Sequence, residues 1–251
     1  MTLREKLKWN GDISFHVKTV EKTLAEIASG KAQEVTYYWN VGETARYAIE
    51  VYLGGNTETS KRIAKMVVDA VLLYFYGDWR NHLKTQNGES GHEAWLLRCL
   101  WYDEVHRSFS FAAALSDWDA MKRISQYPPE EKLSAVDKAR GETAWSWAII
   151  NFIRGESKAR VEKFLKMAED DKSKRPKLLC PILRALMNND ATAFEKTLLA
   201  YLCYYRKSEF KHELLKMVAL TGTTLYHLGR KQGFKVTLPE NVADHVIRFE
   251  K

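Results

Sequence analysis

The sequence predicts an all-α protein, built as an irregular bundle of stacked antiparallel helical hairpins in a solenoid-like arrangement. Apolar residues recur at helical spacing in nearly every window of the 251 residues. Strict alternation over the length of a strand is hard to find. The best strand candidate, residues 234–238, is short and is followed by Pro239, which cannot donate to a β-ladder. Short polar turns of similar layout separate successive apolar stripes.

Each stripe predicts the buried face of one amphipathic helix, because spacings of three and four residues place side chains on the same side. In chain order the stripes are Val17, Val20, Leu24 and Ile27; Tyr38, Val41, Ala45, Ile49 and Tyr52; Ile63, Val67, Ala70, Val71, Tyr74 and Phe75; Leu97, Trp101, Val105 and Phe109; Trp145, Ala148, Ile149 and Phe152; Phe194, Leu198, Tyr201, Leu202 and Tyr205; and Leu214, Met217, Val218, Leu225 and Leu228.

Helix-start and helix-stop residues agree with these stripes. Residues 134–137 have capping-box spacing, and prolines 128 and 129 with two following acids suit a helix N-terminus. Asn56 or Thr57 and Asn189 or Asp190 can cap the helices that follow them. Glycines fall at or near several predicted helix ends, where a left-handed residue is easily accommodated.

Three segments share one layout, in which an apolar helix end is followed by a polar turn and a new helix. They are residues 113–120, 152–159 and 184–191. Their spacing is close to the size of a two-helix repeat unit. We therefore expect one all-helical domain over residues 1–251, with an N-terminal half, 1–90, that could pack on a hairpin-repeat half, 91–251.

Cysteine usage and hydropathy indicate a cytoplasmic protein that does not enter the membrane. Cys99, Cys180 and Cys203 are an odd number of widely separated residues, which predicts buried free thiols in a reducing compartment. The N-terminus lacks the apolar stretch of a secretory signal. The longest apolar run, residues 67–76, contains Asp69 and is too short to span a bilayer.

The net charge of +7 is compatible with nucleic acid, an anionic surface or an acidic protein as partner. Basic residues are distributed along the whole chain. The densest cluster, residues 172–177, is expected to be a solvated loop, since short charge runs are usually exposed. The charge pattern alone does not favour nucleic acid binding.

No catalytic, metal-binding or cofactor-binding residues are expected. Asp103 lies one helical turn before His106, and His82 and His92 are near in sequence, but a second carboxylate–imidazole pair is missing. Structural or surface histidines are therefore favoured. The sequence also lacks a nucleophile elbow and a phosphate-binding loop ending in Gly-Lys-Ser or Gly-Lys-Thr.

The high aromatic content, with eight Trp and twelve Tyr, points to possible contact residues for a protein partner. Tyr, Trp and Arg are the usual anchors of protein interfaces. Trp118, in a turn with Asp117 and Asp119, is the aromatic residue most expected to be exposed, and Trp101 and Tyr102 form a second candidate pair. Equally supported is the alternative that Trp118 packs onto its own hairpin.

The C-terminal part of the chain carries a recognisable order of elements. Residues 185–198 form a helix end, an Asn-Asn-Asp turn and a new helix; residues 220–228 form an apolar helix rich in small residues; and residues 229–239 lead into an apolar tail that ends in proline. This order, with a further hairpin at Trp118, resembles the immunity protein 49 family of bacterial polymorphic toxin systems. The resemblance extends from about Leu97 to the C-terminus.

The resemblance implies an all-helical cytosolic protein that binds a cognate protein toxin and blocks it, without catalytic residues of its own. Because this chain is basic, such a partner is expected to present an acidic surface, or to be contacted away from any nucleic-acid groove. Two alternatives remain: a helical-repeat scaffold or adaptor protein, and a basic nucleic-acid-binding protein whose affinity would fall steeply with salt.

Overall fold

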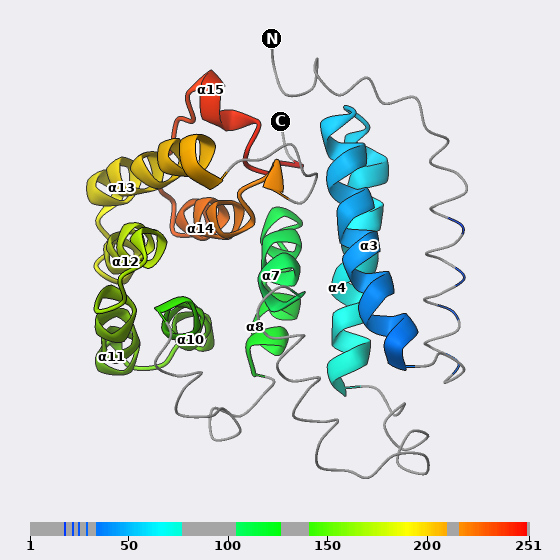
Figure 1. The fold of residues 1–251 in the computed structure, drawn as a ribbon, viewed down its shortest axis with the longest axis horizontal. Helices are drawn as coiled ribbons and strands as arrows, with labels where there is room; N and C mark the ends of the chain where they lie inside the picture. The colour runs from blue at the N-terminus through cyan, green and yellow to red at the C-terminus, as the bar shows by residue number, and fades with distance from the viewer. Residues whose placement is uncertain are drawn as a thin grey trace.

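The computed structural model describes residues 34–76, 104–126, 141–209 and 216–249, together with Lys18, Lys22, Ala25 and Ser29. Within these residues all regular secondary structure is helical, which confirms the predicted all-α class (Figure 1). The helices are α3 (Glu34–Leu53), α4 (Thr57–Tyr76), α7 (Glu104–Ala114), α8 (Trp118–Gln126), α10 (Gly141–Arg154), α11 (Lys158–Glu169), α12 (Lys174–Met187), α13 (Ala191–Tyr204), the π-helix η2 (Tyr205–Glu209), α14 (Leu220–Lys231) and α15 (Glu240–Ala243).

Four hairpins, α3–α4, α7–α8, α10–α11 and α12–α13, make up most of this architecture, and the two helices of each pack on one another. Figure 1 shows α3–α4 as an upright pair on one side and α11, α12 and α13 stacked on the other. Helices α7, α8, α10 and α14 lie between them. This arrangement matches the predicted stack of helical hairpins.

The hairpin turns are built alike. In the α3–α4 turn, the Asn56 amide donates to the Val51 carbonyl at 3.1 Å, and Gly55 has a left-handed φ of 90°. Asn56 Oδ1 then accepts from the Thr59 amide at 3.1 Å and caps α4. A left-handed residue that ends one helix is thus followed directly by the residue that caps the N-terminus of the next helix.

The same device recurs at the turns predicted from the shared sequence layout. The left-handed residues are Ser116, Gly155 and Asn189, and the capping residues are Asp117, Ser157 and Asp190. The three segments that share a sequence pattern therefore share a turn, which confirms their prediction as helix boundaries.

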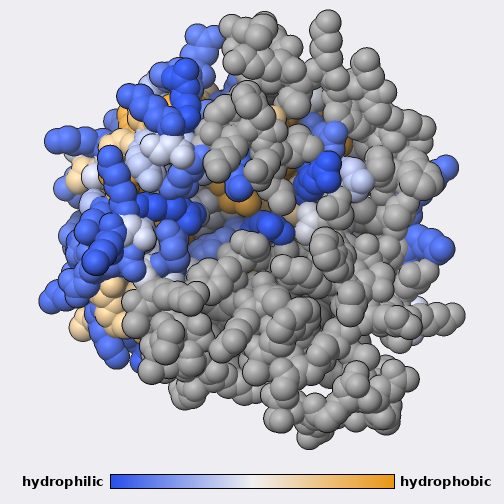
Figure 2. Space-filling model, viewed as in Figure 1, coloured by the Kyte–Doolittle hydropathy of each residue, from blue (hydrophilic) through white to orange (hydrophobic). Residues whose placement is uncertain are grey.

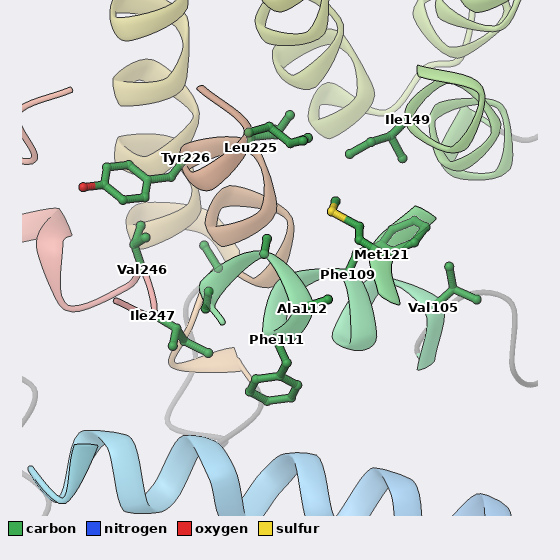
Figure 3. Close-up of a cluster of buried hydrophobic side chains, with 14 of the residues drawn as sticks. Val105, Phe109, Phe111, Ala112, Met121, Ile149, Leu225, Tyr226, Val246 and Ile247 are labelled. Atoms are coloured by element: carbon green, nitrogen blue, oxygen red, sulfur yellow. The ribbon is translucent and has the colours of Figure 1, made fainter. Parts of the chain in front are cut away.

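A continuous hydrophobic core runs through the described helices. Figure 3 shows Phe109 of α7 and Met121 of α8 on the side of Ile149 of α10, with Leu225 of α14 to the left of Ile149. Phe111, also on α7, points to the opposite side, toward the α3–α4 hairpin. Because α7 packs against both α4 and α14, it links the first described hairpin to the C-terminal helices.

The C-terminal segment returns across the core and joins α14 to α3. The buried hydroxyl of Tyr52 donates to the Val246 carbonyl at 3.2 Å and accepts from the Arg248 amide at 3.1 Å. The amide of Ile247 donates to Thr223 Oγ1 at 3.1 Å. This segment has no helical periodicity, so the sequence analysis did not anticipate its role.

Two sequence expectations about helix boundaries are corrected. The basic residues 172–177 were expected to be a loop, but α12 begins at Lys174, with Pro176 in its first turn, where proline is tolerated. Met217 and Val218 are buried as expected but precede α14, which begins at Leu220. The first predicted stripe, residues 17–27, and the caps at 128–137 lie outside the residues described in full.

Candidate functional site

The predicted contact residues at the α7–α8 turn have mainly structural partners. Asp117 Oδ1 accepts from the Ala120 amide at 3.1 Å and caps α8, while Asp117 Oδ2 lies 3.7 Å from Lys65 Nζ of α4. Asp119 is exposed in the first turn of α8, where its charge favours the helix dipole. Asp117 thus contributes to the fold, and Asp119 remains accessible.

Trp118 is partly buried against the core, and its ring connects two helices. The ammonium of Lys231, at the end of α14, lies 4.5 Å from the ring centroid. A cation over an indole face is attracted by the ring quadrupole. The side chain therefore links the start of α8 to the end of α14. Trp101 and Tyr102, the other candidate pair, lie outside the described residues.

A shallow open groove of about 700 Å³ lies beside this turn, between α4 and the end of α7. Its lining residues are Glu58, Lys61, Arg62, Lys65, Met66, Leu115, Ser116 and Asp117. Lys65 contacts both Asp69 and Asp117. One of the three cations that line the groove is therefore paired within the protein itself.

A group of partly buried polar side chains lies on the other side of α7 and centres on Arg175 of α12. Arg175 Nη1 donates to Glu142 Oε2 of α10 at 2.8 Å, and Nη2 donates to Thr221 Oγ1 of α14 at 3.1 Å. Arg175 Nε lies 3.4 Å from Glu209 Oε2 of η2. One guanidinium therefore connects four separate elements, as its planar set of donors allows.

His106 of α7 adjoins this cluster. Its Nε2 lies 2.7 Å from Ser146 Oγ, and Ser146 Oγ donates to the Glu142 carbonyl at 2.8 Å. Burial, and to a smaller extent the charge of Arg175, lower the pKa of His106 to about 3. The imidazole is therefore neutral at pH 7, and its contact with Ser146 is a hydrogen bond between uncharged groups.

Two carboxylates, those of Glu142 and Glu209, face Arg175. Burial raises the pKa of Glu209, and the nearby Glu142 raises it further, while Arg175 opposes both effects. Two acids facing one guanidinium leave an excess of negative charge if Arg175 is removed. The geometry thus assigns Arg175 a structural function: it holds α10, η2 and α14 against α12.

Replacing Arg175 with Met is expected to destabilise the protein by about 1–2 kcal/mol at pH 7, because Glu142 and Glu209 would then repel each other. The value is below that for breaking a fully buried pair, since about a third of the Arg175 side chain is exposed. As the pH falls, Glu209, whose pKa is raised by burial, binds a proton and the repulsion weakens, so the stability difference from wild type should shrink. Chemical denaturation at several pH values measures it.

Lys177→Met is the matched control, because it removes a cation of the same helix that has no ion pair with a described residue. It should change stability by no more than about 0.5 kcal/mol at any of these pH values. Two results would contradict the structural role of Arg175. One is an equal loss of stability in the two variants, and the other is a stability difference between Arg175→Met and wild type that does not depend on pH.

The two described cysteines differ in environment. Cys180 is buried, and burial raises the pKa of its thiol to about 12. Cys203 is exposed, so the expectation of buried thiols was wrong for this residue, which follows the buried Tyr201 and Leu202 onto the outer side of α13. Cys99 lies outside the described residues.

Within the described residues, no group of three or more His, Cys, Asp and Glu side chains is placed to hold a metal ion. In the same residues, every helix is too short or too polar to cross a bilayer. Asp103, His82 and His92, weighed as ligands with His106, fall in segments that the structure does not describe.

The sequence analysis missed the Arg175 cluster, although one signal for it was present. Leu179, Ile182 and Leu186 are buried on one face of α12, and the same helical spacing extended backward reaches Arg175. Its side chain is therefore the first member of the inward stripe. The basic composition of residues 172–177 concealed this, because the run was taken as a loop.

Comparison with known proteins identified no relative: no family model, curated protein or solved structure matches this chain.

Proposed function

We propose that this protein is an immunity protein of a bacterial polymorphic toxin system, which binds a cognate toxin domain and neutralises it by protein–protein contact. The observation that carries the proposal is the order of elements in the C-terminal part. In the sequence, the helix end, Asn-Asn-Asp turn and new helix of residues 185–198, followed by the apolar segment 220–228 and the tail to Pro239, resemble the immunity protein 49 family.

The geometry of the described ionisable groups is compatible with a binding function. His106 and Arg175 are engaged with neighbouring helices, and Arg184 of α12 forms hydrogen bonds with Glu162 and Glu169 of α11. These contacts stabilise the stacking of helices. A stiff helical body of this kind presents its outer side chains in fixed positions, which lowers the entropic cost of binding.

Co-expression with the toxin domain encoded beside this gene tests the proposal. The chain is expected to restore growth of cells that produce the toxin and to co-purify with it. The matched control is the chain carrying Phe194→Asp, which places an unpaired charge in the core and should remove the fold and the protection together. If the folded wild-type chain neither protects cells nor retains the toxin, the proposal is wrong.

A further inference from the structure

We propose that a basic surface at one end of the α12–α13 hairpin is the docking site for an acidic segment of the toxin partner. This surface, the basic end, comprises Lys172, Lys174, Lys177, Tyr204, Arg206 and Lys207. The inference rests on the proposed function and adds to it the location of the interface and the chemistry of the partner. It starts from the basic run that the sequence analysis expected to be a solvated loop.

The fold brings the two parts of the basic end together. Helices α12 and α13 are antiparallel, so the start of α12 lies beside the end of α13. Lys174 Nζ lies 5.2 Å from the ring centroid of Tyr204, which fixes this proximity. Arg175, the residue after Lys174, also contacts Glu209 at the end of η2. This second contact confirms that the start of α12 lies beside the end of α13 and η2.

The positive charge of the basic end is not offset by close contacts with described carboxylates, although Asp171 interacts with Lys177 beyond ion-pair distance. Lys172, Lys174, Lys177, Arg206 and Lys207 are all exposed, and none forms an ion pair with a described residue. Hydrophilic side chains cover the side of the molecule where α11, α12 and α13 lie (Figure 2). Of the acids near the basic end, Glu209 faces Arg175 and Asp171 accepts from the amides of Gly141 and Ser173, while Asp170 is exposed.

The groove beside α4 has a more mixed charge, because the acids Glu58 and Asp117 line it with its cations and Lys65 is paired with Asp69 and Asp117. Charge complementarity therefore favours the basic end as the surface for an acidic partner. Uncompensated positive charge steers an acidic partner toward the surface and repels a basic one. A nucleic acid would be attracted by the same charges, so the test must separate the two.

The underlying structure is suited to hold the basic end in place. Arg175 fixes the first turn of α12 to α10 and α14, and the Tyr205 hydroxyl donates to the carbonyls of Lys216 and Val218 at 2.9 and 3.0 Å. The half-buried Tyr204 provides an aromatic surface between the lysines. Tyrosine is among the residues that contribute most to protein interfaces.

The test is the affinity of the toxin domain for a variant carrying Lys172→Glu, Lys174→Glu and Lys177→Glu, measured at low and high salt. Affinity at low salt should fall about tenfold or more, and most of the loss should be in the association rate. A second variant, with Lys61→Glu, Lys122→Glu and Lys235→Glu, makes the same change in net charge at three separate exposed positions. It should retain affinity within about twofold. Far-UV circular dichroism and the melting temperature report whether each variant folds.

The outcomes distinguish this inference from the proposed function. If the toxin binds wild type and both variants equally, the basic end is not the interface, although the protein remains an immunity protein. If the toxin does not bind wild type at all, the proposed function fails first. A short single-stranded RNA and a short DNA duplex serve as further probes. The inference would be overturned in favour of a nucleic acid partner if wild type binds either probe and the first variant does not, while the first variant still binds the toxin.

Discussion

Gly229→Ala is expected to lower stability by about 2 kcal/mol and the melting temperature by about 4–8 °C. A methyl group at this position would come within 2.5 Å of Phe194 Cζ. The Phe194 ring is fully buried and packs at a tilt of 56° against the Phe234 ring, with a centroid distance of 5.3 Å, so it has little room to move. Alanine favours the helix by about 1 kcal/mol, but separating α13 from α14 costs more.

The steric cause can be isolated with a second substitution. Phe194→Leu alone should destabilise by about 1 kcal/mol, and combining it with Gly229→Ala should cost less than the sum of the two. Gly222→Ala is the matched control on the same helix. There the new methyl group would lie 2.8 Å from Leu202 Cδ2, the tip of a flexible side chain, so a smaller effect is expected. Additive costs at positions 194 and 229 would contradict the packing described for α14.

The second large effect is a loss of stability in mild acid caused by His106. In the folded state the pKa of His106 lies at about 3, whereas the unfolded side chain titrates near 6.5. Between these values the unfolded chain binds a proton that the folded protein excludes, so stability falls as the pH falls through this window. By pH 5 this group should have removed about 2 kcal/mol.

His106→Gln separates this effect from other acid sensitivity. Glutamine keeps a hydrogen-bonding group near Ser146 but cannot titrate, so the variant should lose about 1 kcal/mol or less at pH 7. Its stability should then decline less steeply than that of wild type between pH 6.5 and 4.5. His245, whose pKa is also lowered by burial, remains in both proteins and provides the shared background. If the stabilities of the two proteins instead decline in parallel as the pH falls, His106 binds a proton in the folded state as readily as in the unfolded state, and this account of it is wrong.

The helices and turns could be predicted from the sequence because their signals are local. The buried face of α4 contains Ile63, Val67 and Val71, as helical spacing predicts, and Asn56 and Asp190 are the expected caps. These features depend on neighbours within a few residues. Helical spacing of apolar residues and the preference for certain capping residues were therefore sufficient to predict these helices and turns.

The long-range contacts could not be predicted in the same way. The Tyr52 hydroxyl binds the backbone of residues 246 and 248, and Trp118 receives the Lys231 ammonium, but no local spacing joins these pairs. Arg175 is an intermediate case: the helical stripe of α12 reaches it, but only the packing of α10 and η2 supplies its acidic partners.

The candidate contact residues likewise depend on both local signals and long-range contacts. Of the residues first proposed for partner contact, Asp117 is committed to a helix cap and Trp118 to the contact with α14. The lysines of the basic end were visible in the sequence, whereas their position beside Tyr204 depends on the antiparallel pairing of α12 and α13. The proposed interface therefore follows from tertiary structure more than from any motif.

Titration calorimetry of the purified toxin domain into the purified chain tests the central claim most directly. We expect saturable binding at equimolar ratio, with an affinity that falls as salt is added because the contact is between opposite charges. A folded chain that gives no heat of binding with the toxin at either low or high salt would contradict the claim that this helical protein acts by holding that partner.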